Sequence, residues 1–326
     1  KVSIMKIKRY IKHFIPPMIL KKYKEYKKKQ RKTRIFPSYF LDYYNYEFNR
    51  YKEYSNSFFI NNTSEKLLST IIAEYHSLEK GLTMGRMRPN FGQQKINSLI
   101  DLCKNYIEQY DSSNEMLKEA IGVINEYKIA HENSGYNLTH ELNSKIEELT
   151  KTSNNKYVTQ QLFFCKESYL KEISSSFYEF SNSRHSVRDF KEDGIIDIET
   201  IKSSIALAHN APSTCNRQSV RIHVITDKYL LNEVLLLQNG NRGFGNRACK
   251  LLIVTSDLQC WEGPGQQHGP YLDAGIYILN LLYSLHYYKV GACALNWYVK
   301  IENDMKLRAL VGIPEEAVVA TSIVGG

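Results

Sequence analysis

The chain reads SRHSVRDF over residues 183–190 and HNAPSTCNRQSVRIHVIT over residues 209–226. Alternate side chains of an extended segment project to the same side, so Arg184, Ser186 and Arg188 would present two guanidinium groups and a hydroxyl together. Donors of this kind suit a phosphomonoester. We therefore interpret the first stretch as a candidate phosphate site, with an ordinary exposed strand as the alternative.

The second stretch has the pattern of a helix end at a proline, a polar loop and the start of a strand. Asn216 and Gln218 carry amides that both donate and accept hydrogen bonds, which suits the edge of a heterocycle. Pro212, Ser213 and Thr214 would form a tight loop with small polar groups. An ordinary helix-to-strand connection is the alternative interpretation.

Around these stretches, predicted helices alternate with predicted strands. Asp197 can cap a helix that Pro212 ends, and an apolar helix follows over residues 271–288. Strands are predicted over residues 219–226, 250–256 and 317–324. This alternation predicts a sheet domain of the α/β or α+β class over residues 179–326.

The preceding region, residues 35–178, has a helical pattern without a convincing period-two run. One helix should begin at Ser64 and end where Gly81 takes a left-handed conformation, and a second should span about 93–110. A helical hairpin is expected over residues 111–175. The segment 74–92, EYHSLEKGLTMGRMRPNFG, is either a helix terminus with solvated charges or a ligand-contact loop.

The formal charge of +9 is unevenly distributed along the chain. Residues 1–34 hold 14 lysines and arginines against one acidic residue, whereas the rest holds 29 basic and 33 acidic residues. The arm has an amphipathic basic pattern over residues 4–18, so it is a solvated or packed tail, an anionic-membrane anchor or a nucleic-acid contact. The acidic balance of the main body argues against nucleic acid as a partner.

The six cysteines form no CxxC pair and have no metal-ligand spacing with histidines. We expect free thiols and no metal site. The apolar stretch 271–288 is interrupted by Asp273, Asn280 and His286, which a lipid-facing helix would tolerate poorly. A buried helix of a cytoplasmic protein is therefore predicted there.

In order along the chain, these motifs resemble the nitroreductase family of FMN-dependent oxidoreductases. The resemblance covers residues 180–326. Its carriers are the Arg-x-Ser-Val-Arg run, the Ala-Pro-Ser-x-x-Asn-x-Gln run, the strand KLLIVTS, the helix from Tyr271, the turn ALNW and the segment KLRALVGIPEEAVVATSIVGG. It implies an α+β fold with a central mixed or antiparallel sheet flanked by helices, here preceded by an all-helical region.

The resemblance also implies a cofactor, FMN, and a homodimer with flavin sites at its interface. The residues that would contact FMN come from three segments: Arg184, His185, Ser186 and Arg188; Pro212, Ser213, Thr214, Asn216 and Gln218; and Leu295 and Asn296. The first segment would hold the phosphate and ribityl chain. The loop at Pro212 would reach the flavin of the partner subunit, and the helix from Tyr271 would lie in the dimer core.

The implied activity is hydride transfer from NADH or NADPH through flavin N5 to an organic acceptor, with no general base named because the flavin carries the chemistry. Arg242, Phe244 and Trp297 are the candidates for the acceptor site. Two alternatives remain: a flavoprotein that converts a specialised substrate without nicotinamide, and a non-catalytic, membrane-associated scaffold in a surface-polysaccharide pathway.

Three domains are expected: a basic arm at 1–34, a helical accessory region at 35–178 and the FMN-binding domain at 179–326. Members of the family usually continue past the Gly-Gly at 325–326, so we expect the native chain to be longer than this sequence. The arm would place a cytoplasmic protein on the inner face of a membrane.

Overall fold

A computed structural model describes residues 40–57, 63–84, 87–152 and 164–326 of the chain. The predicted basic arm lies outside the described residues. Residues 62–261 and 268–326 form one compact unit, and residues 1–61 with 262–267 form another. The described part of the smaller unit contains a helix over residues 40–54 and the short 3-10 helix η4, Pro264–Gln266. The remaining elements all belong to the larger unit.

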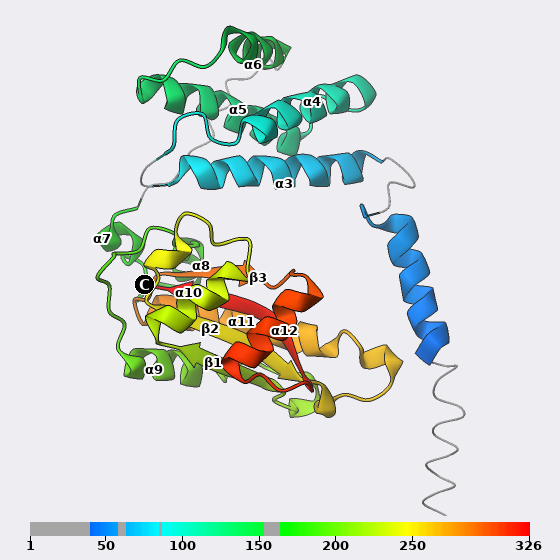
Figure 1. Ribbon diagram of the computed structural model, residues 1–326, viewed down its shortest axis with the longest axis vertical. Helices are drawn as coiled ribbons and strands as arrows, with labels where there is room; N and C mark the ends of the chain where they lie inside the picture. Colours follow the sequence, from blue (N-terminus) through cyan, green and yellow to red (C-terminus); the bar gives the residue numbers. More distant parts are fainter. Residues whose placement is uncertain (1–39, 58–62, 85–86, 153–163) are drawn as a thin grey trace, which may run out of the picture. The chain divides into compact units, whose positions relative to one another are not determined.

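Four helices of the larger unit share a hydrophobic core of their own. They are α3 (Ser64–Leu82), α4 (Gln93–Gln109), α5 (Glu115–Asn133) and α6 (His140–Thr152) (Figure 1). Apolar residues three and four apart put one face of each helix into this core, as Ile96, Leu99, Ile100 and Cys103 do on α4. The predicted helical region is therefore helical in its described part.

The start of α3 at Ser64 agrees with the prediction, whereas its C-terminal end differs. Thr63, rather than Ser64, is the N-cap, and its hydroxyl accepts a hydrogen bond from Lys66 N. Gly81 lies inside the helix and the C-cap is Thr83. The reason for a glycine is space, since a Cβ at position 81 would lie 2.0 Å from the Phe91 ring. Residue 81 therefore needs glycine for packing and not for a left-handed conformation.

The second half of the unit is built on a four-stranded sheet of order β1-β2-β4-β3. All three neighbouring pairs are antiparallel, so the predicted α+β class is confirmed. The strands are β1 (Val220–Ile225), β2 (Lys250–Asp257), β3 (Ala292–Asn296) and β4 (Ala317–Gly325). The three predicted strands are all present, whereas the ALNW segment, expected as a turn, forms most of β3 because it pairs with β4 from Ala294 to Asn296.

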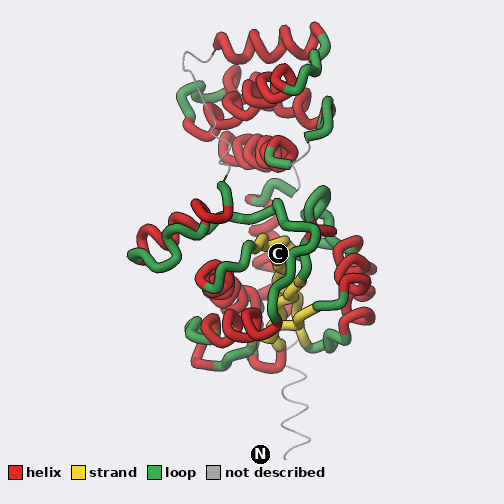
Figure 2. Tube along the Cα trace, turned by 90° about the vertical axis from the view of Figure 1, so that its left-hand side faces the viewer, coloured by secondary structure: helices red, strands yellow, loops and turns green. Residues whose placement is uncertain are grey.

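Helices cover both faces of this sheet, as Figure 2 shows with the strands in yellow between them. On one face, α9 (Ile198–Ala208) and α11 (Gly269–Tyr287) supply the apolar residues that meet the sheet. On the other, α10 (Lys228–Leu236) and α12 (Ile301–Val311) do so. Asp197 caps α9 as predicted, through Glu199 N. The sequence did not predict α10 or α12, whose apolar patterns are short.

Short elements connect these layers: α7 (Lys166–Tyr169), α8 (Phe177–Ser183), η1 (Thr214–Asn216), η2 (Gly245–Arg247) and η3 (Leu258–Cys260). Residues 184–190 run from the end of α8 without regular secondary structure. They lead from α8 to the edge of the sheet at β3, where the candidate site lies.

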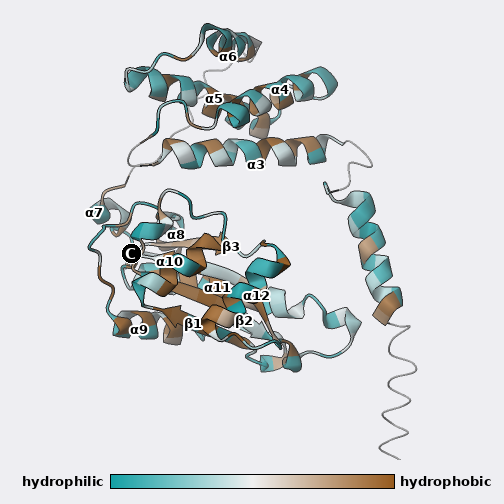
Figure 3. Cartoon of the chain, viewed as in Figure 1, coloured by the Kyte–Doolittle hydropathy of each residue, from teal (hydrophilic) through white to brown (hydrophobic). Residues whose placement is uncertain are grey.

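Hydropathy follows the layers, with mainly hydrophobic strands β1 and β2 and a mainly hydrophilic α6 (Figure 3). Buried residues of α11 recur as Ala274, Tyr277, Leu281 and Leu285, which face the sheet. Within the described ranges, no helix has the length and apolar character needed to cross a bilayer. All six cysteines are free thiols.

Candidate cofactor site

The segment 184–190 is fixed along the start of β3. Val187 N donates a hydrogen bond to Ala292 O at 3.0 Å, and Phe190 is buried in the core beside the sheet. Gly291 allows this approach, since a Cβ there would lie 3.1 Å from Val187 Cγ1 and 3.2 Å from Gly326 O. The chain therefore presses the predicted phosphate segment against the sheet edge.

A cavity of about 1010 Å³ lies along this segment. Arg184, His185, Ser186 and Arg188 all line it, so the structure brings the first predicted set together. The lining cations outnumber the lining carboxylates, and one of those carboxylates, Asp189, is already paired with Arg247 at 2.7 Å. The lysines and arginines in the lining are Lys166, Arg184, Arg188, Lys191 and Lys289, and the acids are Asp189 and Asp193.

Arg188 has a buried hydrogen-bond donor without an acceptor. Its Nε atom has no partner among the described residues. The Arg188 guanidinium and the Ser186 hydroxyl both approach the thiol of Cys293, which is 3% exposed on β3. Burial raises the pKa of Cys293, while Arg188 and Ser186 act in the opposite direction. A buried donor with no acceptor is costly in a folded protein, which points to a ligand atom at this place.

Arg184 stands in a second cationic group at the same cavity. Burial, together with the nearby Arg184 and His185, lowers the pKa of His286 to about 4. His286 Nε2 lies 2.8 Å from Ser183 Oγ, and its buried Nδ1 has no partner among the described residues. Burial and Arg184 also lower the pKa of His185. Both histidines are therefore kept uncharged at neutral pH, and Arg184 is the cation of this group.

Aromatic rings enclose this end of the cavity. His185 stacks on Phe164 with ring centroids 4.9 Å apart, and Tyr169 meets His286 edge-on at 4.8 Å. The Tyr169 hydroxyl donates to His185 O at 3.2 Å. These contacts hold the backbone that carries Arg184.

The donor set fits a phosphomonoester. Two arginines and a hydroxyl line one cavity, one arginine has an orphaned buried donor, and the surrounding charge is positive. A phosphate dianion would accept from these donors and relieve the repulsion between the cations.

The second predicted set forms a separate, strained loop. Thr214 donates to the buried carboxylate of Asp273 from both its backbone N, at 3.0 Å, and its hydroxyl, at 2.7 Å. Cys215, Asn216 and Gln218 have φ values of 51°, 54° and 50°, although none is glycine. Gln218 Nε2 donates to Asn216 Oδ1 at 2.9 Å, and both side chains are exposed. Such strain is characteristic of functional loops, and Asp273 provides the anchor that maintains it.

The two sets lie at opposite corners of the sheet. The loop Pro212–Gln218 precedes β1, which forms one edge, while Val187 bonds to the start of β3 at the other edge. Val220 pairs with Ser256 at the end of β2, whereas Ala292 pairs with Gly325, next to Lys250 at its beginning. Three strand spacings, roughly 14 Å, separate the edges alone. One copy of the chain therefore does not bring the two sets into one site.

Leu295 and Asn296 lie near the end of β3, an edge strand. Leu295 O accepts from Thr321 Oγ1 at 2.6 Å, and Asn296 O accepts from Gln238 Nε2 at 3.0 Å. Their carbonyls are thus occupied within the protein. Alternate N–H groups of an edge strand point away from its neighbour and are available to a ligand.

The three candidates for the acceptor site differ in their surroundings. Arg242 is exposed and lines a second cavity of about 980 Å³ with Arg88, Arg247 and two acidic residues. Phe244 is 1% exposed and packs against Phe190, so its ring is a core element that no ligand reaches in this structure. The Trp297 indole is partly buried, and its Nε1 donates to Asp304 Oδ1 at 2.8 Å. The prediction for Phe244 fails because the chain turns into the core at positions 244 and 245, after the exposed Gly243.

Three residues of the site escaped the sequence-based prediction: Tyr169, His286 and Cys293. His286 was noted only as an interruption of an apolar helix, and Cys293 as a free thiol. A polar residue inside an otherwise apolar helix was the available signal, because buried polar groups require partners. The partners themselves come from segments about a hundred residues away.

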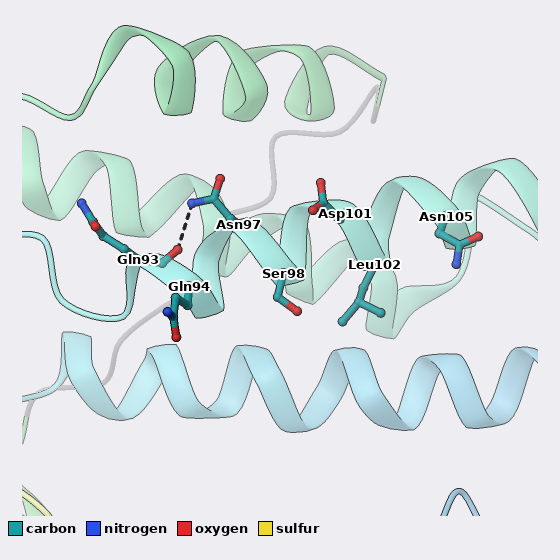
Figure 4. Close-up of a pocket in the computed structure, with 7 residues that line it drawn as sticks. All are labelled: Gln93, Gln94, Asn97, Ser98, Asp101, Leu102 and Asn105. Carbon is teal, nitrogen blue, oxygen red and sulfur yellow. Dashed lines mark hydrogen bonds between the residues drawn. The ribbon is translucent and has the colours of Figure 1, made fainter. Parts of the chain in front are cut away.

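A further depression of about 660 Å³ lies over α4 (Figure 4). All its lining residues come from a single helix, and its one drawn hydrogen bond runs from Asn97 Nδ2 to Gln93 O at 2.9 Å. A site built by one exposed helix face has no opposing wall. We regard it as solvated surface.

An antiparallel sheet between helical layers defines the chain as an α+β protein, with a cationic cavity at one edge of its sheet. Residues 182–240 match the family model described as Nitroreductase family. This range contains Arg184, Arg188, Asn216 and Gln218, so the resemblance predicted from the motifs is confirmed there. None of the curated proteins matches the chain.

Several solved structures are similar to part of the chain. A nitroreductase family protein from Clostridium novyi NT is 16% identical, with a TM-score of 0.42, over 46% of this chain and 84% of that one. An FMN-dependent nitroreductase from Clostridium difficile R20291 is 20% identical, with a TM-score of 0.40, over 45% and 84%. A nitroreductase family protein from Clostridium difficile 630 is 19% identical, with a TM-score of 0.39, over 46% and 83%.

Proposed function

We propose that the protein is an FMN-dependent oxidoreductase that takes hydride from NADH or NADPH and passes it to an organic acceptor. The observation that carries the proposal is the cavity at residues 184–188, with its orphaned Arg188 Nε and unbalanced cations. When bound, FMN supplies a ring that accepts hydride and releases it to a second substrate. The family match at residues 182–240 supports the same cofactor class.

In this proposal the chain binds and orients the cofactor. Arg184, Ser186 and Arg188 hold the phosphate and the ribityl chain, and the edge of β3 at Leu295 and Asn296 offers a backbone N–H group to the ring. Cys293, which is 3% exposed, packs in the core next to Arg188 and Ser186. No side chain is assigned a proton transfer.

We further propose that the working form is a homodimer. The loop at Pro212 and the phosphate segment lie at opposite corners of one sheet, so a second copy is needed to bring the two sets together. On the face of α11 turned away from the sheet, Leu272, Ile276 and Leu279 are 66%, 46% and 51% exposed. An apolar stripe of this kind suits burial against the same helix of a partner subunit.

The test is a visible spectrum of the purified protein before and after addition of NADH or NADPH without oxygen. We expect bound FMN that is released by denaturation and bleached by one of the two nucleotides. Flavin that neither nucleotide bleaches would replace this proposal with a nicotinamide-independent flavoprotein. Protein that is colourless and fails to bind added FMN would overturn both.

A further inference from the structure

The segment EYHSLEKGL, at the C-terminal end of α3, has no role in the proposed function so far. Its last turn belongs to the same compact unit as the sheet. Met84 packs against the core beside the sheet, and its Sδ lies 3.0 Å from where a Cβ of Gly243 would be. Thr83 lines the same cavity as Arg184 and Arg188. The end of the helix is therefore held next to the candidate cofactor site.

Lys80 lies one turn before this contact, and its ammonium interacts electrostatically with Arg188. Burial lowers the pKa of the Lys80 ammonium, and Arg188, a like charge, lowers it further, whereas Cys293 acts in the opposite direction. In the described part of the chain, the Lys80 ammonium has no ion pair, while lysines elsewhere on these helices, such as Lys95 with Glu74 at 3.0 Å, do. Two neighbouring cations with no offsetting acid repel each other.

We propose that Lys80 is a third cation for the FMN phosphate, so that the helical region supplies part of the cofactor site. This inference rests on the proposed function. It uses the same orphaned donor, Arg188 Nε, together with the position of Thr83, three residues after Lys80, in the lining of the cavity. A phosphate between them would accept charge-assisted hydrogen bonds from each, and the repulsion in the free protein would become attraction to the ligand.

A competing explanation is that Lys80 complements the C-terminal end of the α3 dipole, as basic residues in a last turn often do. The two explanations differ in their dependence on ligand. A dipole partner affects the free protein and leaves FMN affinity unchanged, whereas a phosphate ligand affects FMN affinity and leaves binding of riboflavin, which lacks the phosphate, unchanged.

The experiment measures the affinity of the full chain for FMN and for riboflavin, by quenching of flavin fluorescence. Lys80→Met keeps the length of the side chain and removes its charge, Lys80→Arg keeps the charge, and Lys66→Met removes a lysine from the far end of the same helix. We expect Lys80→Met to weaken FMN binding about tenfold and riboflavin binding less than twofold. Lys80→Arg and Lys66→Met should remain within about threefold of the wild type.

A second measurement separates binding from folding. We expect FMN to raise the thermal unfolding midpoint of Lys80→Met less than that of the wild type, while the midpoint without FMN is equal or higher because the repulsion from Arg188 is gone. Equal FMN affinity of Lys80→Met and wild type would overturn the inference alone. Equal losses of FMN and riboflavin affinity would overturn the phosphate assignment. A wild type that binds no FMN would overturn the proposed function as well.

Discussion

Arg188 combines a buried donor that has no acceptor with two neighbouring groups, Lys80 and Cys293, that offer it no anion. The Nε atom contributes nothing favourable to the stability of the free protein, because the desolvation of this atom is not compensated by a hydrogen bond. Its contribution should instead appear on ligand binding.

Replacing Arg188 by methionine should therefore weaken FMN binding about 10- to 100-fold, the range for a hydrogen bond to a charged group, and change the free energy of unfolding without ligand by less than about 1 kcal/mol. Fluorescence titration and urea unfolding measure the two effects. Arg308→Met is the contrasting control, since Arg308 Nε donates to Asp304 at 2.7 Å and its Nη1 to Pro314 O. It should lose stability and keep its FMN affinity. Unchanged FMN affinity of Arg188→Met would contradict the assignment.

His286 should make stability depend on pH. Its pKa of about 4 in the folded protein lies below the ordinary 6.5, so as the pH falls the unfolded chain takes up a proton first. Stability from the neutral ring is fully present above pH 6.5 and is lost progressively down to about pH 4, by up to about 3 kcal/mol.

The comparison is with His286→Gln, which can still bond to Ser183 and cannot titrate. Urea unfolding at pH 7, 6, 5 and 4.5 should give a steeper loss for the wild type than for the variant. Parallel slopes would show that folding does not lower the pKa of His286. The measurement is made without FMN, so that it reports the folding of the chain alone. His286 is not one of the proposed phosphate ligands.

At the scale of single elements, α3 depends on the absence of a side chain at position 81. A methyl group there would lie 2.0 Å from Phe91, which also stacks with His131 at 5.7 Å in the bundle core. Alanine is the better helix former by about 1 kcal/mol, so propensity and packing oppose each other at this residue.

We expect packing to dominate, so that Gly81→Ala lowers the free energy of unfolding by about 1–2 kcal/mol, since overpacking costs typically 1–3. Thermal unfolding followed by circular dichroism measures the change. The clash should disappear in a Phe91→Ala background, where Gly81→Ala should become neutral or stabilising. Additive losses in the double variant would mean that Phe91 is not the obstacle.

The strand β3 explains how one element serves both the fold and the site. Its inward residues Cys293 and Leu295 join the core, while Asn296 is exposed and its edge faces the cavity region. The sequence of this strand is short and apolar, and such a segment is also compatible with a turn. A turn was predicted for ALNW, residues 294–297. The segment is a strand because it pairs with β4, since buried backbone N–H and C=O groups must be hydrogen-bonded.

At the scale of the whole molecule, the exposed stripe on α11 should determine the oligomeric state. Replacing both Leu272 and Leu279 by glutamate puts charges at the centre of the proposed contact, where a partner copy would bury them unpaired. We expect the double variant to be monomeric in analytical ultracentrifugation and to retain less FMN.

Leu236→Glu is the matched control, because Leu236 is 78% exposed on α10 at the opposite face of the sheet. It should leave both the oligomeric state and the flavin content unchanged. A wild type that is monomeric while holding FMN would show that one copy of the chain completes the site. The two predicted sets of residues would then not form one site across a dimer interface.

Local patterns were sufficient to predict much of this protein. Alternating and helical periodicities gave β1, β2, β4, α9 and α11, because burial of one face imposes its period on the chain. The spacing in SRHSVRDF predicted that Arg184, Ser186 and Arg188 share a ligand, and they line one cavity. The sequence did not predict short elements such as α10 and α12. It also did not predict the direction of single side chains such as Phe244, because that direction depends on the surrounding turn.

By itself, the sequence determined the α+β class, the helical character of the region before it and the residues of the candidate phosphate segment, since each follows from neighbours close in the chain. Only the tertiary structure decided which distant groups join that segment. It placed Cys293 and His286 behind the arginines, brought Lys80 beside Arg188 and put the loop at Pro212 at the far corner of the sheet. The physical reason is that sheet order and helix docking arise from the packing of faces far apart in the chain, which no local pattern encodes.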